Sequence, residues 1–252
     1  MIEDDFNDVL GKAIRGLGFD VDSLNLDPVR LKNCLRGEFD AEIIQALAPA
    51  LNLNTERLLD LPNYQPELEL ELEGYIPAAV RIFISSFGHL GVNAFTVEND
   101  SHLLIFDTGT NAEECVDYIS SFQEKEKHLF ITHPHADHLG CEDELLPHVN
   151  TSQLLKPGKV LTFGKLTLTS LDVAGHSVPA TAYLIEGLET PLCIVGDAIF
   201  AGSIGGISQD NYKLALNNIH KNILTLPANT ILLNGHGPAT SVGLELKHNP
   251  FL

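Results

Sequence analysis

The pattern of apolar positions divides this chain into two regions. In residues 1–62, apolar side chains recur three or four positions apart, as on one face of a helix. Residues 5–17 follow this spacing. Asp27 followed by Pro28, then Asp40, and then Asn54 or Thr55 are typical of helix N-termini. We therefore expect three more helices, over residues 29–35, 43–51 and 55–61.

From about residue 76 the pattern changes to short apolar runs bounded by turn residues, which predicts strands. We expect strands at residues 80–85, 93–98, 103–106, 129–131, 159–162, 165–171, 181–185, 192–195 and 230–233, and helices at 111–122 and 211–224. The alternation of Glu and Leu over residues 67–73 predicts either an exposed strand or a charged tether. The chain is therefore expected to consist of a helical N-terminal domain (1–62), a linker (63–77) and a second domain (78–252).

Composition and charge limit the partners. The 252 residues are 44% hydrophobic, enough for a substantial core, and no apolar run is long enough to span a membrane. The net charge is −19, from 34 acidic and 15 basic residues. Nucleic acids and anionic membrane surfaces are bound chiefly through Lys and Arg, so neither is an expected partner. The expected partner is a small-molecule substrate.

The cysteines and the acidic start of the chain favour the cytoplasm. Residues 1–5 lack the basic and then apolar pattern of a secretory signal. The four cysteines are scattered and form no CxxC pair, as expected of reduced thiols in a cytoplasmic protein: Cys34, Cys115, Cys141 and Cys193. Cys141 follows the histidine-rich run described next and is an alternative metal ligand, although better ligands lie nearby.

Residues 132–140 read THPHADHLG and follow a short apolar run that predicts a buried strand. In an extended or turning segment, His133 and His135 leave the backbone on one side and can bind one ion. Asp137 and His138 can then reach a second ion. Imidazoles with a carboxylate suit zinc, iron or manganese better than calcium. The alternative is a histidine-rich surface loop, but the spacing favours a metal site.

Three further candidate ligands, His176, Asp197 and His236, each follow a glycine at the end of a predicted strand. Any one alone could be a capping residue or a surface histidine. In this order, however, together with Asp107 and the run from His133 to His138, they resemble the metallo-β-lactamase superfamily over residues 78–252.

The resemblance implies an α+β fold, an αββα sandwich with the site at one edge, beside the small all-helical N-terminal domain. It implies that His133, His135 and His176 bind one metal ion, that Asp137, His138 and His236 bind a second, and that Asp197 bridges them. Asp107 would hold the metal loop without binding a metal itself. Two divalent ions, zinc first and iron or manganese as alternatives, would share a hydroxide nucleophile, and Asp137 would orient it and handle a proton.

Residues 196–205 and 235–240 are similar to the short form of glyoxalase II-like hydrolases, and only 38 residues separate Asp197 from His236. This similarity implies thioester hydrolysis. Gly206 stands where those enzymes often carry Arg, and 16 residues follow His236 where the full-length enzymes have a glutathione-binding domain. The thiol carrier and the substrate-binding residues are therefore left open. A mononuclear iron persulfide dioxygenase and a lactonase are alternative functions.

Residues 31–61 resemble the later helices of repressor-type helix-turn-helix domains, so a metabolite-sensing DNA-binding regulator is a further alternative. Residues 1–80, however, contain 16 acidic and 6 basic residues, too few positive charges for good phosphate contacts. A helical module for packing, for shaping the pocket mouth or for forming a homodimer is the favoured interpretation.

Overall fold

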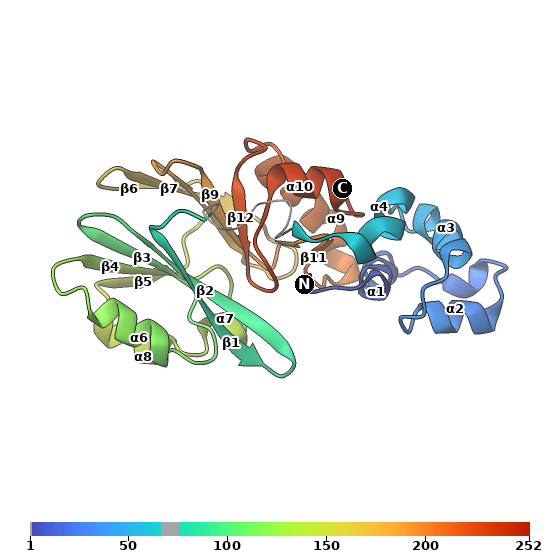
Figure 1. Cartoon of the computed structure of the whole chain (residues 1–252), viewed down its shortest axis with the longest axis horizontal. Coiled ribbons are helices and arrows are strands. Elements are labelled where there is room, and N and C mark those ends of the chain that lie inside the picture. Colours follow the sequence, from blue (N-terminus) through green and yellow to red (C-terminus); the bar gives the residue numbers. More distant parts are fainter. Residues whose placement is uncertain (1, 67–75) are drawn as a thin grey trace.

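Two β-sheets face each other in the computed structural model, which describes residues 2–66 and 76–252 (Figure 1). The first sheet has the order β1 (Val80–Phe87), β2 (Leu90–Glu98), β3 (His102–Phe106), β4 (Glu126–Phe130) and β5 (Thr151–Gln153). The second has the order β13 (Thr240–Ser241), β12 (Ile231–Asn234), β9 (Leu192–Gly196), β8 (Thr181–Glu186), β7 (Leu166–Asp172) and β6 (Val160–Phe163). The short strands β10 (Ile199–Phe200) and β11 (Ser203–Ile204) pair separately.

Alternating side chains give each sheet two buried faces. In β3, Leu104 and Phe106 enter the core between the sheets, whereas Leu103 and Ile105 face the helices outside the first sheet. Those helices are α6 (Glu113–Ser120), α7 (Ala136–Leu139) and α8 (Glu142–Leu145). The outer face of the second sheet packs against α9 (Gln209–Asn218) and α10 (Val242–His248). The expected αββα sandwich is therefore confirmed.

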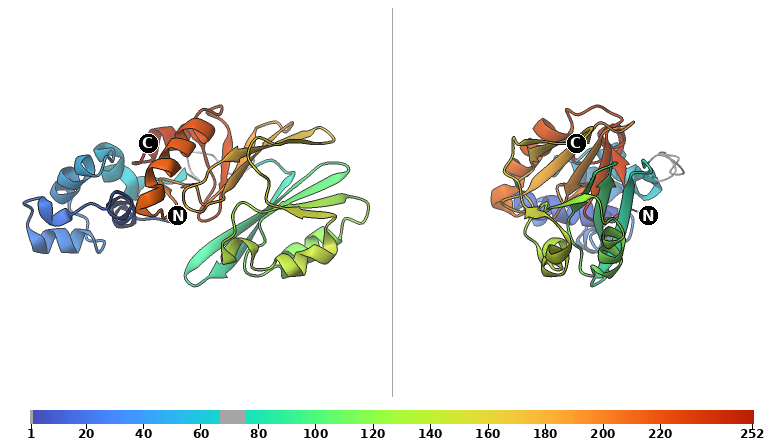
Figure 2. Two further views of the ribbon diagram at one scale, coloured as in Figure 1. Left: turned by 180° about the vertical axis from the view of Figure 1, so that it is seen from behind. Right: turned by 90° about the vertical axis from the view of Figure 1, so that its left-hand side faces the viewer.

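The N-terminal helices extend this last layer (Figures 1 and 2). They are α1 (Phe6–Leu17), α2 (Pro28–Cys34), α3 (Ala41–Ala50) and α4 (Thr55–Asp60). The predicted caps are confirmed, since the side chains of Asp27, Asp40 and Asn54 each accept a backbone N–H bond in the first turn of the following helix. One hydrophobic cluster joins these helices to the second sheet, with Leu47 of α3 and Val195 of β9 among its members.

A buried carboxylate also joins the two regions. Glu245 of α10 accepts hydrogen bonds from the hydroxyls of Tyr64 (3.0 Å) and Thr240 (2.7 Å), from the N–H of Gly202 (3.0 Å) and from the amide of Asn249 (2.8 Å). Burial raises the pKa of Glu245 to about 7, against the effect of its donors. Tyr64 lies in the expected linker but is itself buried. The domain boundaries at residues 62 and 78 stay a prediction.

Most expected elements are present, with ends shifted by a few residues. The expected helix 211–224 begins at Gln209 and changes at Ile219 to a single π-helical turn (Ile219–Ile223). The sequence pattern missed the short strands β5, β10, β11 and β13, because two or three residues carry too little periodicity. It also missed the helix α10, whose seven residues make fewer than two full turns. Residues 67–73, expected as a strand or a tether, lie outside the described residues. None of the described helices is long and apolar enough to cross a membrane.

Candidate metal centre

All seven candidate ligands lie just beyond the C-terminal ends of strands. His133 and His135 follow β4, and His176 follows β7. Asp197 follows β9, and His236 follows β12. Asp137 and His138 stand on the short helix α7, which begins directly after His135. Since β12 and β9 are parallel, and β7 is antiparallel to β8 as β8 is to β9, the three strands end at one edge of the second sheet.

The first group consists of three imidazoles. The Nδ1 atom of His135 is 3.1 Å from Nε2 of His133 and 3.0 Å from Nε2 of His176. Nitrogens held at about 2.1 Å from one zinc ion in a tetrahedron lie roughly 3.4 Å apart, which is close to these distances. The three atoms could therefore hold one ion, and His135 would use the opposite ring nitrogen from its two partners.

Asp197 stands at the centre of the second group. Its Oδ1 is 3.3 Å from Nε2 of His138, and its Oδ2 is 3.3 Å from Nε2 of His236 and 3.4 Å from Nε2 of His176. Asp137 approaches the same region, with its Oδ2 3.4 Å from Nε2 of His236. Asp137, His138 and His236 form a second set that could hold an ion, and Asp197 reaches the imidazoles of both sets.

Four of the histidines share one hydrogen-bond pattern, in which Nδ1 meets an oxygen and Nε2 faces the cluster. The partner of His176 is the carbonyl of Gly206 (2.7 Å), and the partner of His236 is the carbonyl of Gly91 (2.8 Å). These carbonyls accept from Nδ1–H, which leaves the Nε2 lone pair free. His133 meets the hydroxyl of Thr132 at 3.0 Å, and His138 meets Asp107 at 2.8 Å. Each ring is thus oriented for metal binding through Nε2.

Asp107 holds the histidine-rich loop, residues 132–140, in place through hydrogen bonds. Its Oδ1 accepts the backbone N–H of Thr132 (2.7 Å), and its Oδ2 accepts the Thr132 hydroxyl (2.8 Å) and lies 2.8 Å from Nδ1 of His138. Asp107 has a φ of 58°, a left-handed conformation that Asp tolerates better than most residues. The turn after β3 therefore points the carboxylate at the loop after β4.

The electrostatics of the cluster favour neutral imidazoles on one side and positive charge on the other. Burial, with repulsion from the other imidazoles, lowers the pKa of His133 to about 2, and burial also lowers the pKa of His176. Burial acts the same way on His138, but the carboxylates of Asp107 and Asp197 outweigh it and raise its pKa to about 11. Positive charge is therefore favoured on His138 beside Asp197, whereas the lowered pKa values of His133 and His176 favour the neutral form that ligates metal.

Two observations support metal binding by these residues. The buried atoms Nε2 of His138 and Oδ1 of Asp197 have no hydrogen-bond partner among the described residues, although such atoms are normally paired. The glycines beside the ligands make room for the cluster: a Cβ at Gly235 would lie 2.1 Å from Oδ1 of Asp197 and 2.6 Å from the ring of His138. The donor set of imidazoles and carboxylates fits zinc, iron or manganese.

Comparisons with known proteins agree with this geometry. The Metallo-beta-lactamase superfamily profile matches residues 87–168. The chain is 30% identical over 200 residues to "Probable metallo-hydrolase YqgX" of Bacillus subtilis, covering 66% of this chain and 94% of that protein. The chain belongs to the metallo-β-lactamase superfamily. Metal-dependent hydrolases of this superfamily are therefore relatives of this chain.

Two further relatives of this superfamily member are informative. "Hydroxyacylglutathione hydrolase GloC" of Haemophilus influenzae is 25% identical over 191 residues, which cover 62% of this chain and 89% of that protein. Among solved structures, the BLEG-1 B3 metallo-beta-lactamase has a TM-score of 0.57 and 29% identity, covering 68% of this chain and 99% of that chain.

The structure places further residues beside the metal cluster that the sequence motif does not include. Lys12 of α1 donates to the carbonyl of Ile204 at 2.7 Å, and its ammonium lies 4.8 Å from the ring centre of Phe200. That ring meets the edge of His236 at 5.7 Å between centroids. No local pattern signals this contact, since it joins residues almost 200 positions apart. Cys141, the alternative ligand, is instead buried in the core beneath the first sheet.

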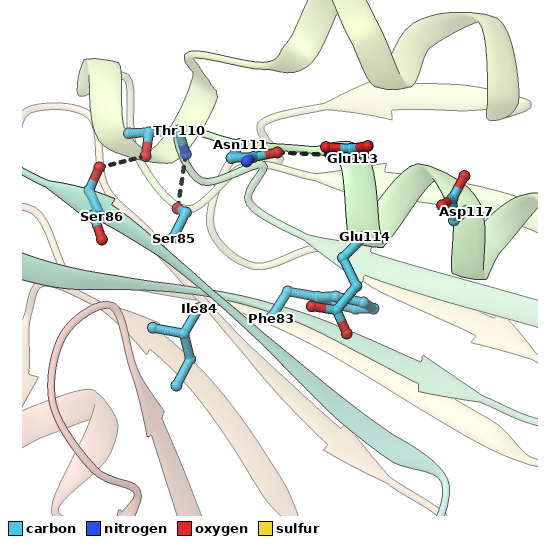
Figure 3. Close-up of a pocket in the computed structure, with 9 residues that line it drawn as sticks. All are labelled: Phe83, Ile84, Ser85, Ser86, Thr110, Asn111, Glu113, Glu114 and Asp117. Carbon is cyan, nitrogen blue, oxygen red and sulfur yellow. Dashed lines mark hydrogen bonds between the residues drawn. The ribbon is translucent and has the colours of Figure 1, made fainter.

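A cavity of about 640 Å³ opens between β1 and α6 (Figure 3). The N–H of Thr110 donates to the hydroxyl of Ser85 at its upper rim, and Glu113, Glu114 and Asp117 of α6 line its other side. None of its lining residues is a candidate metal ligand. This acidic hollow is therefore separate from the cluster.

Proposed function

We propose that this protein is a dinuclear metal-dependent hydrolase that cleaves thioesters. The observation that carries the proposal is the pair of ligand groups on either side of Asp197, whose carboxylate oxygens lie 3.3 Å from Nε2 of His138 and 3.4 Å from Nε2 of His176. His133, His135 and His176 would hold the first ion. Asp137, His138 and His236 would hold the second, with Asp197 between the two. Zinc is the first choice of metal, and iron or manganese are the alternatives.

The side chains have distinct tasks in this proposal. When bound, two such ions supply Lewis acidity and acidify water, so that a hydroxide nucleophile is available near neutral pH. Asp107 and Thr132 orient His138 and His133 through Nδ1, and the carbonyls of Gly206 and Gly91 do the same for the remaining rings. Asp137 is the proposed catalytic carboxylate, which orients the nucleophile and accepts its proton.

The choice of a thioester rests on similarity. GloC is a hydroxyacylglutathione hydrolase by name, and the segments 196–205 and 235–240 are similar to such enzymes.

Location and assembly are part of the same proposal. All four cysteines are free and buried, which supports the reducing cytoplasm. The N-terminal helices use their apolar face against the second sheet, so we assign them a packing role and not a role in DNA binding. The substrate is a small molecule, and a homodimer is left open.

Metal analysis combined with a substrate panel tests the proposal. Protein purified without added metal should contain at least two zinc, iron or manganese ions per chain. It should hydrolyse a hydroxyacylglutathione or another thioester, followed by loss of ultraviolet absorbance. A single iron with oxygen consumption on glutathione persulfide would replace the hydrolase by a dioxygenase, and ring opening of lactones alone would replace the thioester. Failure to bind any metal would overturn the proposal.

A further inference from the structure

A second group of potential ligands lies at the opposite ends of β3 and β4. His102 begins β3 and Glu126 begins β4, and the parallel register pairs these two residues and pairs Leu104 with His128. Alternation along β4 puts Glu126 and His128 on one face, the face of the inter-sheet core. His102 lies five residues before Asp107, about 16 Å along the strand. The group is therefore separate from the catalytic cluster.

The three side chains converge on one point. Nε2 of His128 is 3.7 Å and Nε2 of His102 is 3.9 Å from Oε2 of Glu126. Both separations are too long for hydrogen bonds, yet one ligand atom from each residue lies within 4.8 Å of the others. The two rings are stacked at 5.9 Å between centroids with 27° between their planes. Ligand atoms of one tetrahedral zinc ion lie roughly 3.4 Å apart, so each imidazole needs to approach Glu126 by about 0.5 Å or less to share an ion with it.

The other nitrogen of each ring is already engaged. Nδ1 of His128 is 3.0 Å from the hydroxyl of Thr151, and Nδ1 of His102 is 2.9 Å from the hydroxyl of Ser101. This leaves Nε2 of both rings directed at Glu126, as in oriented metal ligands. Nε2 of His128 is buried and has no hydrogen-bond partner among the described residues. Because buried polar atoms are normally paired, a bound ion would supply the partner that the described residues do not.

Packing holds the rings of His102 and His128 in place, and burial favours the neutral form of His128. Phe163 of β6 packs against both rings, at 5.5 Å from His102 and 4.8 Å from His128 between centroids. Burial lowers the pKa of His128, with a further contribution from His102, which favours the neutral imidazole. Glu126 is 68% exposed in its side chain, which leaves an approach from solvent and room for a water ligand.

We infer that His102, Glu126 and His128 form a third metal site, for zinc or another borderline divalent ion. Two imidazoles and one carboxylate are a zinc donor set, and water completes the tetrahedron. A bound ion ties β3 to β4 at the end of the sandwich remote from the catalytic cluster. Its role is to stabilise the sheet that carries Asp107 and the histidine-rich loop.

Zinc stoichiometry of the full chain tests this site. We compare the wild type with Glu126→Gln, which changes an exposed side chain and removes one ligand charge, and with His220→Gln, an exposed histidine outside the cluster, as the matched control. The metal-free proteins are titrated with zinc against a chromophoric chelator. The wild type and His220→Gln should bind one zinc ion more per chain than Glu126→Gln, with equal hydrolase activity in all three once the catalytic site is loaded.

Anomalous X-ray scattering at the zinc edge provides a second measurement. Crystals of the zinc-loaded wild type should show a peak between the rings of His102 and His128, and crystals of Glu126→Gln should lack it. Equal zinc stoichiometry in the wild type and Glu126→Gln, or a zinc-loaded crystal without this peak, overturns the inference. Either result leaves the catalytic cluster untouched, because no ligand is shared between the two places.

Discussion

Replacing Asp107 by Asn should change which ring nitrogen carries the proton in the neutral, metal-binding forms of His138 and His133. Asn keeps the side-chain shape and tolerates the left-handed backbone at this position. If its carbonyl oxygen continues to accept the N–H of Thr132, its NH₂ group takes the place of Oδ2. That group then faces Nδ1 of His138, which lies 2.8 Å from Oδ2 in the wild type. Two donors cannot pair, so His138 must move its proton to Nε2, the atom proposed to bind metal.

The same substitution reaches His133 through Thr132. In the wild type, the Thr132 hydroxyl donates to Asp107 at 2.8 Å and accepts from His133 at 3.0 Å. With an NH₂ group at position 107, the hydroxyl accepts from Asn and donates to His133, whose proton then moves to Nε2. Loss of an orienting partner typically lowers metal affinity about 10–100-fold, or roughly 1.4–2.8 kcal/mol. We expect a loss of this size for both ions.

Zinc affinities measured by chelator competition on metal-free protein provide the assay, with hydrolase activity as a parallel readout. Thr132→Val is the matched comparison, because it removes only the hydroxyl link to His133 and should weaken mainly the first ion. Thermal unfolding of each variant shows whether the fold is retained. If folded Asp107→Asn protein binds both ions of the catalytic cluster with wild-type affinity, the tautomer argument is wrong.

Three further predictions concern single side chains. His135→Ala should abolish binding of the first ion and activity, while the far-ultraviolet circular dichroism of the helices is unchanged; full activity would contradict the ligand assignment. The pKa of Glu245 is raised from 4.5 to about 7 in the fold, so the folded state holds the extra proton and the free energy of unfolding should fall by about 3 kcal/mol as pH rises through this range. Urea unfolding at pH 5 and pH 8 should show this loss relative to Glu245→Gln, and a pH-independent difference would refute it. Lys12→Met removes the ammonium that pairs with the buried Asp4 and should destabilise the protein by about 2 kcal/mol, unlike Lys32→Met on an exposed position of α2; equal melting temperatures would argue against this contribution of Lys12.

Local patterns predicted much of the fold. Asp27, Asp40 and Asn54 cap their helices because a cap depends only on the next three residues. The apolar run in β9 was recognisable because both faces of this strand are buried. The short strands β10 and β13 were not, since each has only two residues and shows no alternation of apolar and polar positions.

The sequence by itself determined which residue types are available for a metal site, because each candidate ligand stands beside a turn at the end of a recognisable strand. Only the tertiary structure decided how they meet. It selects Nδ1 of His135 but Nε2 of His133, and it brings Lys12 to the loop after β9. It also places His102 beside Glu126 through the register of parallel strands. Such contacts depend on the packing of segments far apart in the chain, and no spacing within one segment encodes them.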